Sequence, residues 1–235
     1  MSHTPPRVLA FDVFGTVADW HTSVAQDIAQ RIPGIDGAAF ARDWRAGYKP
    51  AMARVASGEL GWTRIDDLHR MILNDLLPRY DLADMPEAER RDLNRVWHRL
   101  AVWPDVARGL ARLRSRFICT TLSNGNIGLL TKQARHAGIQ WDCVLSAEVF
   151  GKYKPDPATY LGVADIFDVP AHQVMMVAAH QSDLDSAAAL GLQTAYIERV
   201  NEFGADQPKD VSGNQANSFH AVGFNDLADQ LGCTR

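Results

Sequence analysis

A nearly continuous apolar run, RVLAFDV, occupies residues 7–13 and places Asp12 near its end. A run that is apolar almost throughout is typical of a strand buried on both faces of a parallel sheet. Because such a sheet needs helices against both faces, the run favours an α/β fold. It also puts a charge at the tip of a buried strand, where the following turn with Gly15 and Thr16 can present backbone N–H groups to an anion.

Strands and helices alternate in the second half of the chain, after Pro104. Apolar runs and the breaks between them predict strands over 117–122, 143–145, 174–178 and 193–197, and helices over 105–116, 127–137, 157–167, 182–190 and 225–231. This alternation predicts a parallel sheet with right-handed crossovers. Residues 201–217 are polar, and we expect them to form a loop.

The segment between Trp20 and Leu100 has helical periodicity and no convincing strand. Breaks at 33–34, 57–58, 78 and 86 contain Pro or Gly and divide it into about four expected helices. Ligands of open parallel sheets bind beyond the carboxyl ends of the strands. We therefore expect a core of residues 1–18 and 102–235, with residues 19–101 inserted after the first strand so that they cover that edge.

Composition excludes several classes of partner. The 235 residues carry a formal charge of −4 without a basic stripe, which argues against a nucleic-acid partner. We see no basic segment followed by an apolar run of the kind that forms a signal peptide, and no stretch near the roughly 20 apolar residues that span a bilayer. The three cysteines lie far apart and are expected to be reduced thiols in the cytoplasm.

Three polar residues lie at the ends of the first two core strands. Asp12 fits a carboxylate nucleophile that forms an ester intermediate, although strand-end acids in general more often bond to backbone. Ser123 and Asn124 end the second strand before a helix. They can cap that helix, or bind a substrate anion at its N-terminus, and the two roles are compatible.

Two further segments place polar side chains at the same edge. Lys154 precedes a proline, which holds it extended, and it can keep a carboxylate ionised. Tyr160, one helical turn later, points either to the same cleft or into the core. Asp183 is either a helix N-cap or an acid that orients a water molecule, and His180 either packs nearby or takes a direct chemical role.

Taken in order, these segments resemble the four motifs of the haloacid dehalogenase superfamily. The resemblance implies a Rossmann-like core with a helical cap domain over residues 19–101. Most members of that superfamily are phosphatases, which carry a second aspartate two positions after the nucleophile and a Gly-Asp pair that holds magnesium. This chain has Phe14 at the first of these positions and Ala178-Ala179 in the second stretch. We therefore expect no metal and no cofactor, because Mg²⁺ requires oxygen ligands.

These departures match the type II L-2-haloacid dehalogenases, which use no metal. The Trp44-Arg45 pair matches their cap arginine, although Arg45 alone could be a surface cation on an amphipathic helix. The resemblance implies that Asp12 attacks the halogen-bearing carbon of a small (S)-2-haloacid with inversion. Arg45 and Asn124 would then bind the halide. Water oriented by Asp183 would hydrolyse the ester and release the (R)-2-hydroxy acid.

The same resemblance assigns the other residues. Lys154 and Thr16 join Asp12 and Asp183 as the catalytic set, while the substrate is bound by Ser123, Phe14, Tyr160 and His180. Many of these dehalogenases have serine and asparagine where this chain has Ala178 and His180. A homodimer is also implied by the resemblance.

Three alternatives remain open. A related metal-independent hydrolase that opens a strained ring next to a carboxylate, of the azetidine-carboxylate type, would use the same nucleophile. A magnesium-dependent phosphatase would need the oxygen ligands that Phe14 and Ala178 do not supply. A binding or scaffold protein would have no need of Asp12, Lys154 and Asp183 together.

Overall fold

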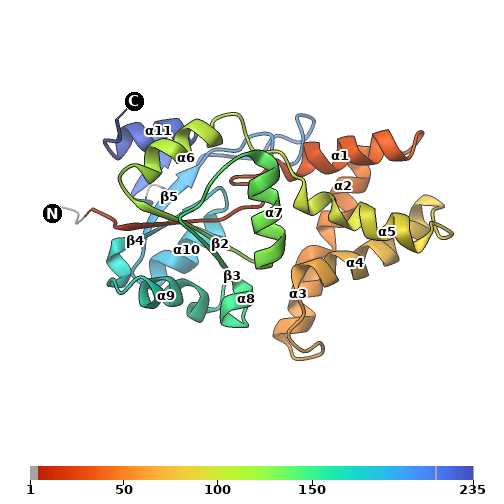
Figure 1. Cartoon of the computed structure of the whole chain (residues 1–235), viewed down its shortest axis with the longest axis horizontal. Helices are drawn as coiled ribbons and strands as arrows, with labels where there is room; N and C mark the ends of the chain where they lie inside the picture. The colour runs from red at the N-terminus through yellow and green to blue at the C-terminus, as the bar shows by residue number, and fades with distance from the viewer. Residues whose placement is uncertain (1–4, 215, 235) are drawn as a thin grey trace.

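Six parallel strands form the centre of the protein, in a computed structural model that describes residues 5–214 and 216–234 (Figure 1). Their order across the sheet is β3-β2-β1-β4-β5-β6. The strands are β1 Val8–Phe11, β2 Ile118–Ser123, β3 Cys143–Ser146, β4 Val174–Ala178, β5 Gln193–Ile197 and β6 Phe219–Ala221. The predicted α/β fold is confirmed. The edge strand β6 was not predicted, because three residues beside a polar segment carry little periodic signal.

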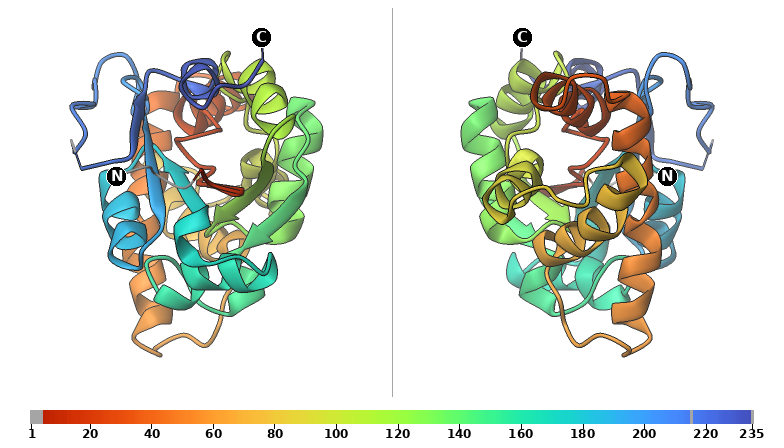
Figure 2. Two further views of the ribbon diagram at one scale, coloured as in Figure 1. Left: turned by 90° about the vertical axis from the view of Figure 1, so that its left-hand side faces the viewer. Right: turned by 90° about the vertical axis from the view of Figure 1, so that its right-hand side faces the viewer.

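Helices cover both faces of the sheet, as Figure 2 shows. Leu9 and Phe11 point to one face, whereas Val8 and Ala10 point to the other, because side chains alternate along a strand. All four are fully buried. The first face packs against α6 (Val106–Arg114), α7 (Ile127–Ala137) and α11 (Phe224–Gln230), and the second against α9 (Pro157–Ile166) and α10 (Gln181–Ala189). Burial on both faces explains why the first strand reads as a continuous apolar run.

Residues 20–98 form helices on one side of the sheet (Figure 1). They are α1 Trp20–Arg31, α2 Gly37–Ala46, α3 Tyr48–Ala56, α4 Ile65–Leu76 and α5 Glu87–Asn94, with 3-10 turns at Leu77–Tyr80 and Arg95–His98, and a short α8, Ala147–Phe150, follows β3. The expectation of about four helices here missed the break at Gly47, between α2 and α3. A side chain at Gly47 would overlap Ile72, so the close approach of α4 requires glycine there.

The chain leaves and re-enters the core at one place. The Asp19 N–H donates to the Ala101 carbonyl at 2.9 Å, and the Trp103 N–H donates to the Val17 carbonyl at 3.1 Å. We propose that this crossing separates the core, 1–18 and 102–235, from the cap, 19–101; positions 1–4, 215 and 235 lie outside the described residues. None of the helices in the described part of the chain is long and apolar enough to cross a membrane.

Candidate active site

The predicted site residues converge at the carboxyl ends of three neighbouring strands. Asp12 follows β1, Ser123 ends β2, and His180 lies just after β4. Because β1 pairs with both β2 and β4, these three strand ends are adjacent. The topology therefore brings together residues that are more than 100 positions apart in the sequence.

Lys154 bridges two carboxylates. Its Nζ lies 3.1 Å from Asp12 Oδ1 and 2.5 Å from Asp183 Oδ2, and the three side chains are only 7–11% exposed. Burial alone would raise the pKa of Asp12, but Lys154, His180 and Thr16 hold that pKa well below its usual range. The two carboxylates in turn raise the pKa of Lys154 despite its burial. Asp12 is therefore an ionised carboxylate with a fixed orientation.

The turn after β1 depends on a glycine. Gly15 has φ +88°, and a side chain there would overlap the Glu202 carboxylate. Thr16 Oγ1 donates to Asp12 Oδ2 at 2.8 Å and accepts from the Ala179 N–H at 2.9 Å. Since the hydroxyl oxygen accepts from Ala179, its proton is directed to Asp12.

Two side chains anchor this turn to other parts of the core. Arg199 Nε donates to the Thr16 carbonyl at 2.9 Å, and Trp103 Nε1 donates to the Gly15 carbonyl at 3.0 Å. The guanidinium of Arg199 is itself fixed by Asp105, whose two oxygens accept from it at 2.9 and 3.0 Å. Fixed anchors of this kind hold the turn, and with it the Asp12 carboxylate, in one position.

Tyr160 combines the two roles that the sequence left open. Its ring is fully buried in the core on α9, and its hydroxyl donates to Asp183 Oδ1 at 2.6 Å. Burial and the Asp183 carboxylate raise the pKa of Tyr160, so the phenol stays protonated. Asp183 lies in the first turn of α10, where the N-cap is His180. Asp183 therefore does not cap the helix. Its carboxylate is instead held by Lys154 and Tyr160.

His180 lies between two carboxylates. Its Nδ1 is 3.2 Å from Asp12 Oδ2, and its Nε2 is 2.7 Å from Glu202 Oε1. Each carboxylate accepts a hydrogen bond from one ring nitrogen, and both nitrogens can donate together only when the ring is an imidazolium. Burial opposes the charge, but Glu202 and Asp12 together raise the pKa of His180 to about 9.

Glu202 and Lys209 belong to the site but were not found from the sequence. Both lie in the polar segment that was expected to be a loop; no helix or strand occurs in residues 201–214 and 216–217. Nevertheless the Glu202 side chain is 1% exposed, and its Oε2 accepts from Lys209 Nζ at 2.6 Å. His180 and Lys209 lower the pKa of Glu202 to about 2, although burial opposes this. Its position just past the carboxyl end of β5 is the one sequence signal that pointed to it.

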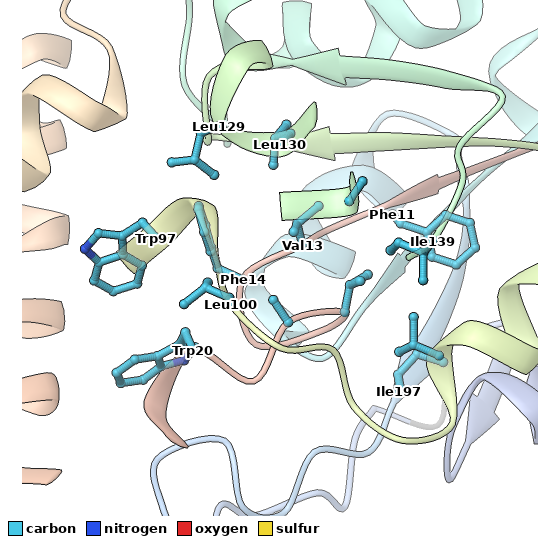
Figure 3. Close-up of a cluster of buried hydrophobic side chains, with 14 of the residues drawn as sticks. Phe11, Val13, Phe14, Trp20, Trp97, Leu100, Leu129, Leu130, Ile139 and Ile197 are labelled. Carbon is cyan, nitrogen blue, oxygen red and sulfur yellow. The ribbon is translucent and has the colours of Figure 1, made fainter. Parts of the chain in front are cut away.

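Arg45 projects from α2 into a cluster of aromatic rings. Its guanidinium carbon lies 4.0 Å from the centroid of the Tyr48 ring, 5.6 Å from Trp20 and 5.9 Å from Phe14. Figure 3 shows Phe14, Trp20 and Trp97 beside one another. The buried Nη1 of Arg45 has no hydrogen-bond partner among the described residues. Arg45 is therefore not a solvated surface cation, and it retains a donor for an anion.

Neutral groups complete this cluster. His69 is fully buried and stacks on Trp97 with ring centroids 4.2 Å apart. Burial and the nearby Arg45 lower the pKa of His69 to about 3, so it is uncharged at neutral pH. The sequence did not single out His69, Trp97 or Tyr48, because an aromatic residue on a helix is most often part of the core.

Ser123 and Asn124 shape the end of β2. Ser123 Oγ accepts from the Gly125 N–H at 3.1 Å, while the N-cap of α7 is Asn126. Asn124 Oδ1 accepts from the Lys154 N–H at 2.8 Å, which connects the second and third motifs. Its Nδ2 makes long contacts, at 3.4 Å, to Met52 Sδ and the Lys154 carbonyl, and the Asn124 side chain also hydrogen-bonds to the Tyr48 hydroxyl. The amide can therefore still donate to a ligand.

A divalent cation does not fit these residues. Both oxygens of Asp183 and both of Asp12 already accept hydrogen bonds, and Phe14, Ala178 and Ala179 offer no side-chain oxygen. Over residues 5–214 and 216–234, no three His, Cys, Asp or Glu side chains are grouped to hold a metal ion. The ammonium of Lys154 provides the positive charge between the carboxylates.

Comparisons with known proteins identify the family of the chain. A family model for haloacid dehalogenase-like hydrolases matches residues 6–191. (S)-2-haloacid dehalogenase 1 of Pseudomonas sp. (strain CBS-3) is 28% identical over 209 residues, covering 84% of this chain and 87% of that protein. The structure of an L-2-haloacid dehalogenase is 41% identical, with TM-score 0.92, and covers 97% of this chain and 100% of that one. A defluorinating L-2-haloacid dehalogenase is 39% identical, also with TM-score 0.92, at 96% and 95% coverage. The family expected from the four motifs is confirmed: the chain belongs to the haloacid dehalogenase-like hydrolases.

Proposed function

We propose that this protein is an (S)-2-haloacid dehalogenase, which hydrolyses a small (S)-2-haloacid to the (R)-2-hydroxy acid and halide. The observation that carries the proposal is that the site holds both an ionised carboxylate, Asp12, and a buried guanidinium nitrogen of Arg45 that has no hydrogen-bond partner among the described residues. Phe14 stands where a general acid would be needed for an alcohol leaving group. A halide leaves as an anion and needs no proton. The similarity to named (S)-2-haloacid dehalogenases supports the same reaction.

The first step is displacement by Asp12. Among the described residues, its Oδ1 accepts one hydrogen bond, from Lys154, whereas Oδ2 accepts from Thr16 and His180. Oδ1 is thus the more available oxygen. It attacks the halogen-bearing carbon from the side opposite the halogen, which forms an aspartyl ester and inverts the configuration. Lys154 keeps the carboxylate ionised throughout.

The leaving halide is bound by Arg45 and Asn124. A guanidinium is more weakly hydrated than an ammonium, and aromatic walls exclude water from its surroundings. Nη1 of Arg45 is buried without a hydrogen-bond partner among the described residues, and Nδ2 of Asn124 makes two long contacts, at 3.4 Å. The substrate carboxylate binds to Ser123 and the backbone N–H groups that follow β2. Phe14 contacts the carbon chain.

The second step hydrolyses the ester. Asp183, held by Tyr160 and Lys154, orients a water molecule that attacks the Asp12 carboxyl carbon. The ester oxygen leaves with the product, and the water oxygen remains in the Asp12 carboxylate. Tyr160 and Lys154 act here by fixing the direction of Asp183. No step uses a metal or cofactor.

The decisive experiment measures free chloride from L-2-chloropropionate and the configuration of the lactate formed. We expect chloride and D-lactate from the unchanged enzyme and neither product from Asp12→Asn. Asp156→Asn is the matched control, because that acid caps α9 through the Ala158 N–H and lies outside the proposed catalytic set. No chloride above the Asp12→Asn level would refute the proposal, and ring opening of L-azetidine-2-carboxylate instead would favour the related hydrolase.

We also infer that the enzyme acts as a homodimer in the cytoplasm. The dimer rests on the family resemblance, and the compartment on three separate thiols that form no disulfide among the described residues. Sedimentation at micromolar concentration tests the dimer, and a monomer there would contradict it.

A further inference from the structure

Two donors converge on one oxygen of Asp12. Thr16 Oγ1 lies 2.8 Å from Oδ2, and His180 Nδ1 lies 3.2 Å from the same atom. If Oδ1 forms the ester, Oδ2 becomes the ester carbonyl oxygen. This is the atom on which negative charge develops when water attacks the carboxyl carbon.

We propose that the His180 imidazolium and the Thr16 hydroxyl form an oxyanion site for hydrolysis of the Asp12 ester. The inference rests on the proposed function and assigns His180 a catalytic role in its second step. Thr16 is suited to this role because its oxygen accepts from the Ala179 N–H, which aims its proton at Oδ2. His180 adds a positive charge at the same atom.

The step balances as follows. The water oxygen bonds to Cγ of Asp12, and the π pair of the Cγ–Oδ2 bond moves onto Oδ2, where His180 and Thr16 stabilise it. When that pair returns, the Cγ–Oδ1 bond breaks and Oδ1 leaves as the hydroxyl oxygen of the product. One water proton ends on that hydroxyl, and the other passes through the Asp183 carboxylate to solvent.

The surroundings of His180 keep it charged after the ester forms. Esterification removes the negative charge of Asp12, but Glu202 remains 2.7 Å from Nε2. Glu202 is buried and is itself held by Lys209. The charged groups that face His180 are thus Asp12 and Glu202, with Lys209 behind Glu202 and Lys154 beyond Asp12. Glycine at position 15 leaves the space that the Glu202 carboxylate occupies.

A general-base role for His180 would require the opposite protonation state. As a base, Nδ1 must be unprotonated when water attacks, so the hydrolysis rate would rise with pH. As an oxyanion donor, Nδ1 must carry its proton, so the rate would fall as pH rises through the pKa of His180. In the free enzyme that pKa is about 9, and loss of the Asp12 charge in the ester lowers it. The direction of the pH profile therefore distinguishes the two roles.

The test separates the two steps in rapid-quench experiments with L-2-chloropropionate. Chloride release reports ester formation, and intact-protein mass reports the ester that accumulates. In His180→Asn a neutral donor replaces a charged one, so we expect ester hydrolysis to slow about 10- to 100-fold while ester formation changes only a few-fold. The matched control is His220→Asn, since His220 also pairs with a glutamate, Glu198, but lies outside the site. It should behave like the unchanged enzyme.

A second measurement uses the unchanged enzyme and does not depend on folding of a variant. Its ester-hydrolysis rate should be highest at neutral pH and should decline with an apparent pKa at or below about 9. A rate that rises with pH would overturn the inference in favour of a general base. Slower ester formation in His180→Asn, without accumulation of ester, would overturn it in favour of a role in positioning Asp12. No chloride from any protein would instead refute the proposed function itself.

Discussion

Replacing Lys154 by methionine isolates the charge at the centre of the site. Methionine keeps an unbranched apolar stem of similar volume, so packing changes little. The substitution removes an ammonium that lies 3.1 Å from Asp12 and 2.5 Å from Asp183. At an effective dielectric constant of about 20, one such contact is worth about 5 kcal/mol before desolvation. Part of this is offset because burying the ammonium is itself costly.

We expect a net loss of about 3–5 kcal/mol in the free energy of unfolding at pH 7, which is the cost of leaving buried charges without their partner. The loss should depend on pH. The lowered pKa of Asp12 stabilises the native state above the unfolded pKa near 3.9, and this stabilisation disappears as pH falls through the native pKa. In the variant Asp12 binds a proton at higher pH. The difference between the two proteins should therefore shrink by about 1 kcal/mol or more between pH 7 and pH 4.

The assay is urea unfolding followed by circular dichroism at both pH values. Lys152→Met is the matched control, since Lys152 lies two positions earlier and is exposed. That substitution should change stability by less than about 0.5 kcal/mol. A loss below about 1 kcal/mol for Lys154→Met at pH 7, or the same loss at both pH values, would refute the electrostatic reasoning.

Three other predictions concern the same site. Gly15→Ala places a side chain at a φ of +88° and against the Glu202 carboxylate. We therefore expect the free energy of unfolding in urea to fall by about 1–3 kcal/mol and dehalogenation to be lost. Unchanged activity would contradict the described turn. Tyr160→Phe removes the hydroxyl that orients Asp183, so ester hydrolysis should slow about 10-fold in single-turnover assays. The free energy of unfolding should fall by about 1 kcal/mol. An effect on ester formation alone would argue against this role. Chelators should not change dehalogenation, and no magnesium-dependent hydrolysis of p-nitrophenyl phosphate should occur, because Phe14 offers no oxygen ligand; activity abolished by a chelator would overturn this reasoning.

The strand ends were predictable because burial leaves a clear pattern in the sequence. The apolar runs before Asp12 and Ser123 and over residues 174–178 located all three central strand ends, and the motif spacing added Lys154 and Asp183. The fold and the family are confirmed, whereas the individual roles of these residues stay predictions. These residues could be found because each one directly follows or precedes a feature with its own local signature.

Glu202 and Gly47 were not found, although Glu202 follows the predicted strand over residues 193–197. Glu202 lies in a polar segment without periodicity, and only tertiary contacts with His180 and Lys209 bury it. Gly47 lies between α2 and α3, where a side chain would overlap Ile72 of α4, and no local pattern reveals that contact. His180 showed a departure from the family pattern, but its charge depends on Glu202, 22 positions later. Contacts of this kind are set by the assembled fold and not by local sequence.

The crossing near Ala18 and Val102 has a consequence for how such a protein can diversify. The two chain segments are joined there by backbone hydrogen bonds, so both ends of the intervening segment are held together by the core itself. Changes in length or sequence within that segment leave the register of the sheet, and hence the spacing of Asp12, Lys154 and Asp183, unaltered. If Arg45 binds the leaving group as proposed, its surroundings can change without moving the residues proposed to make and break the ester.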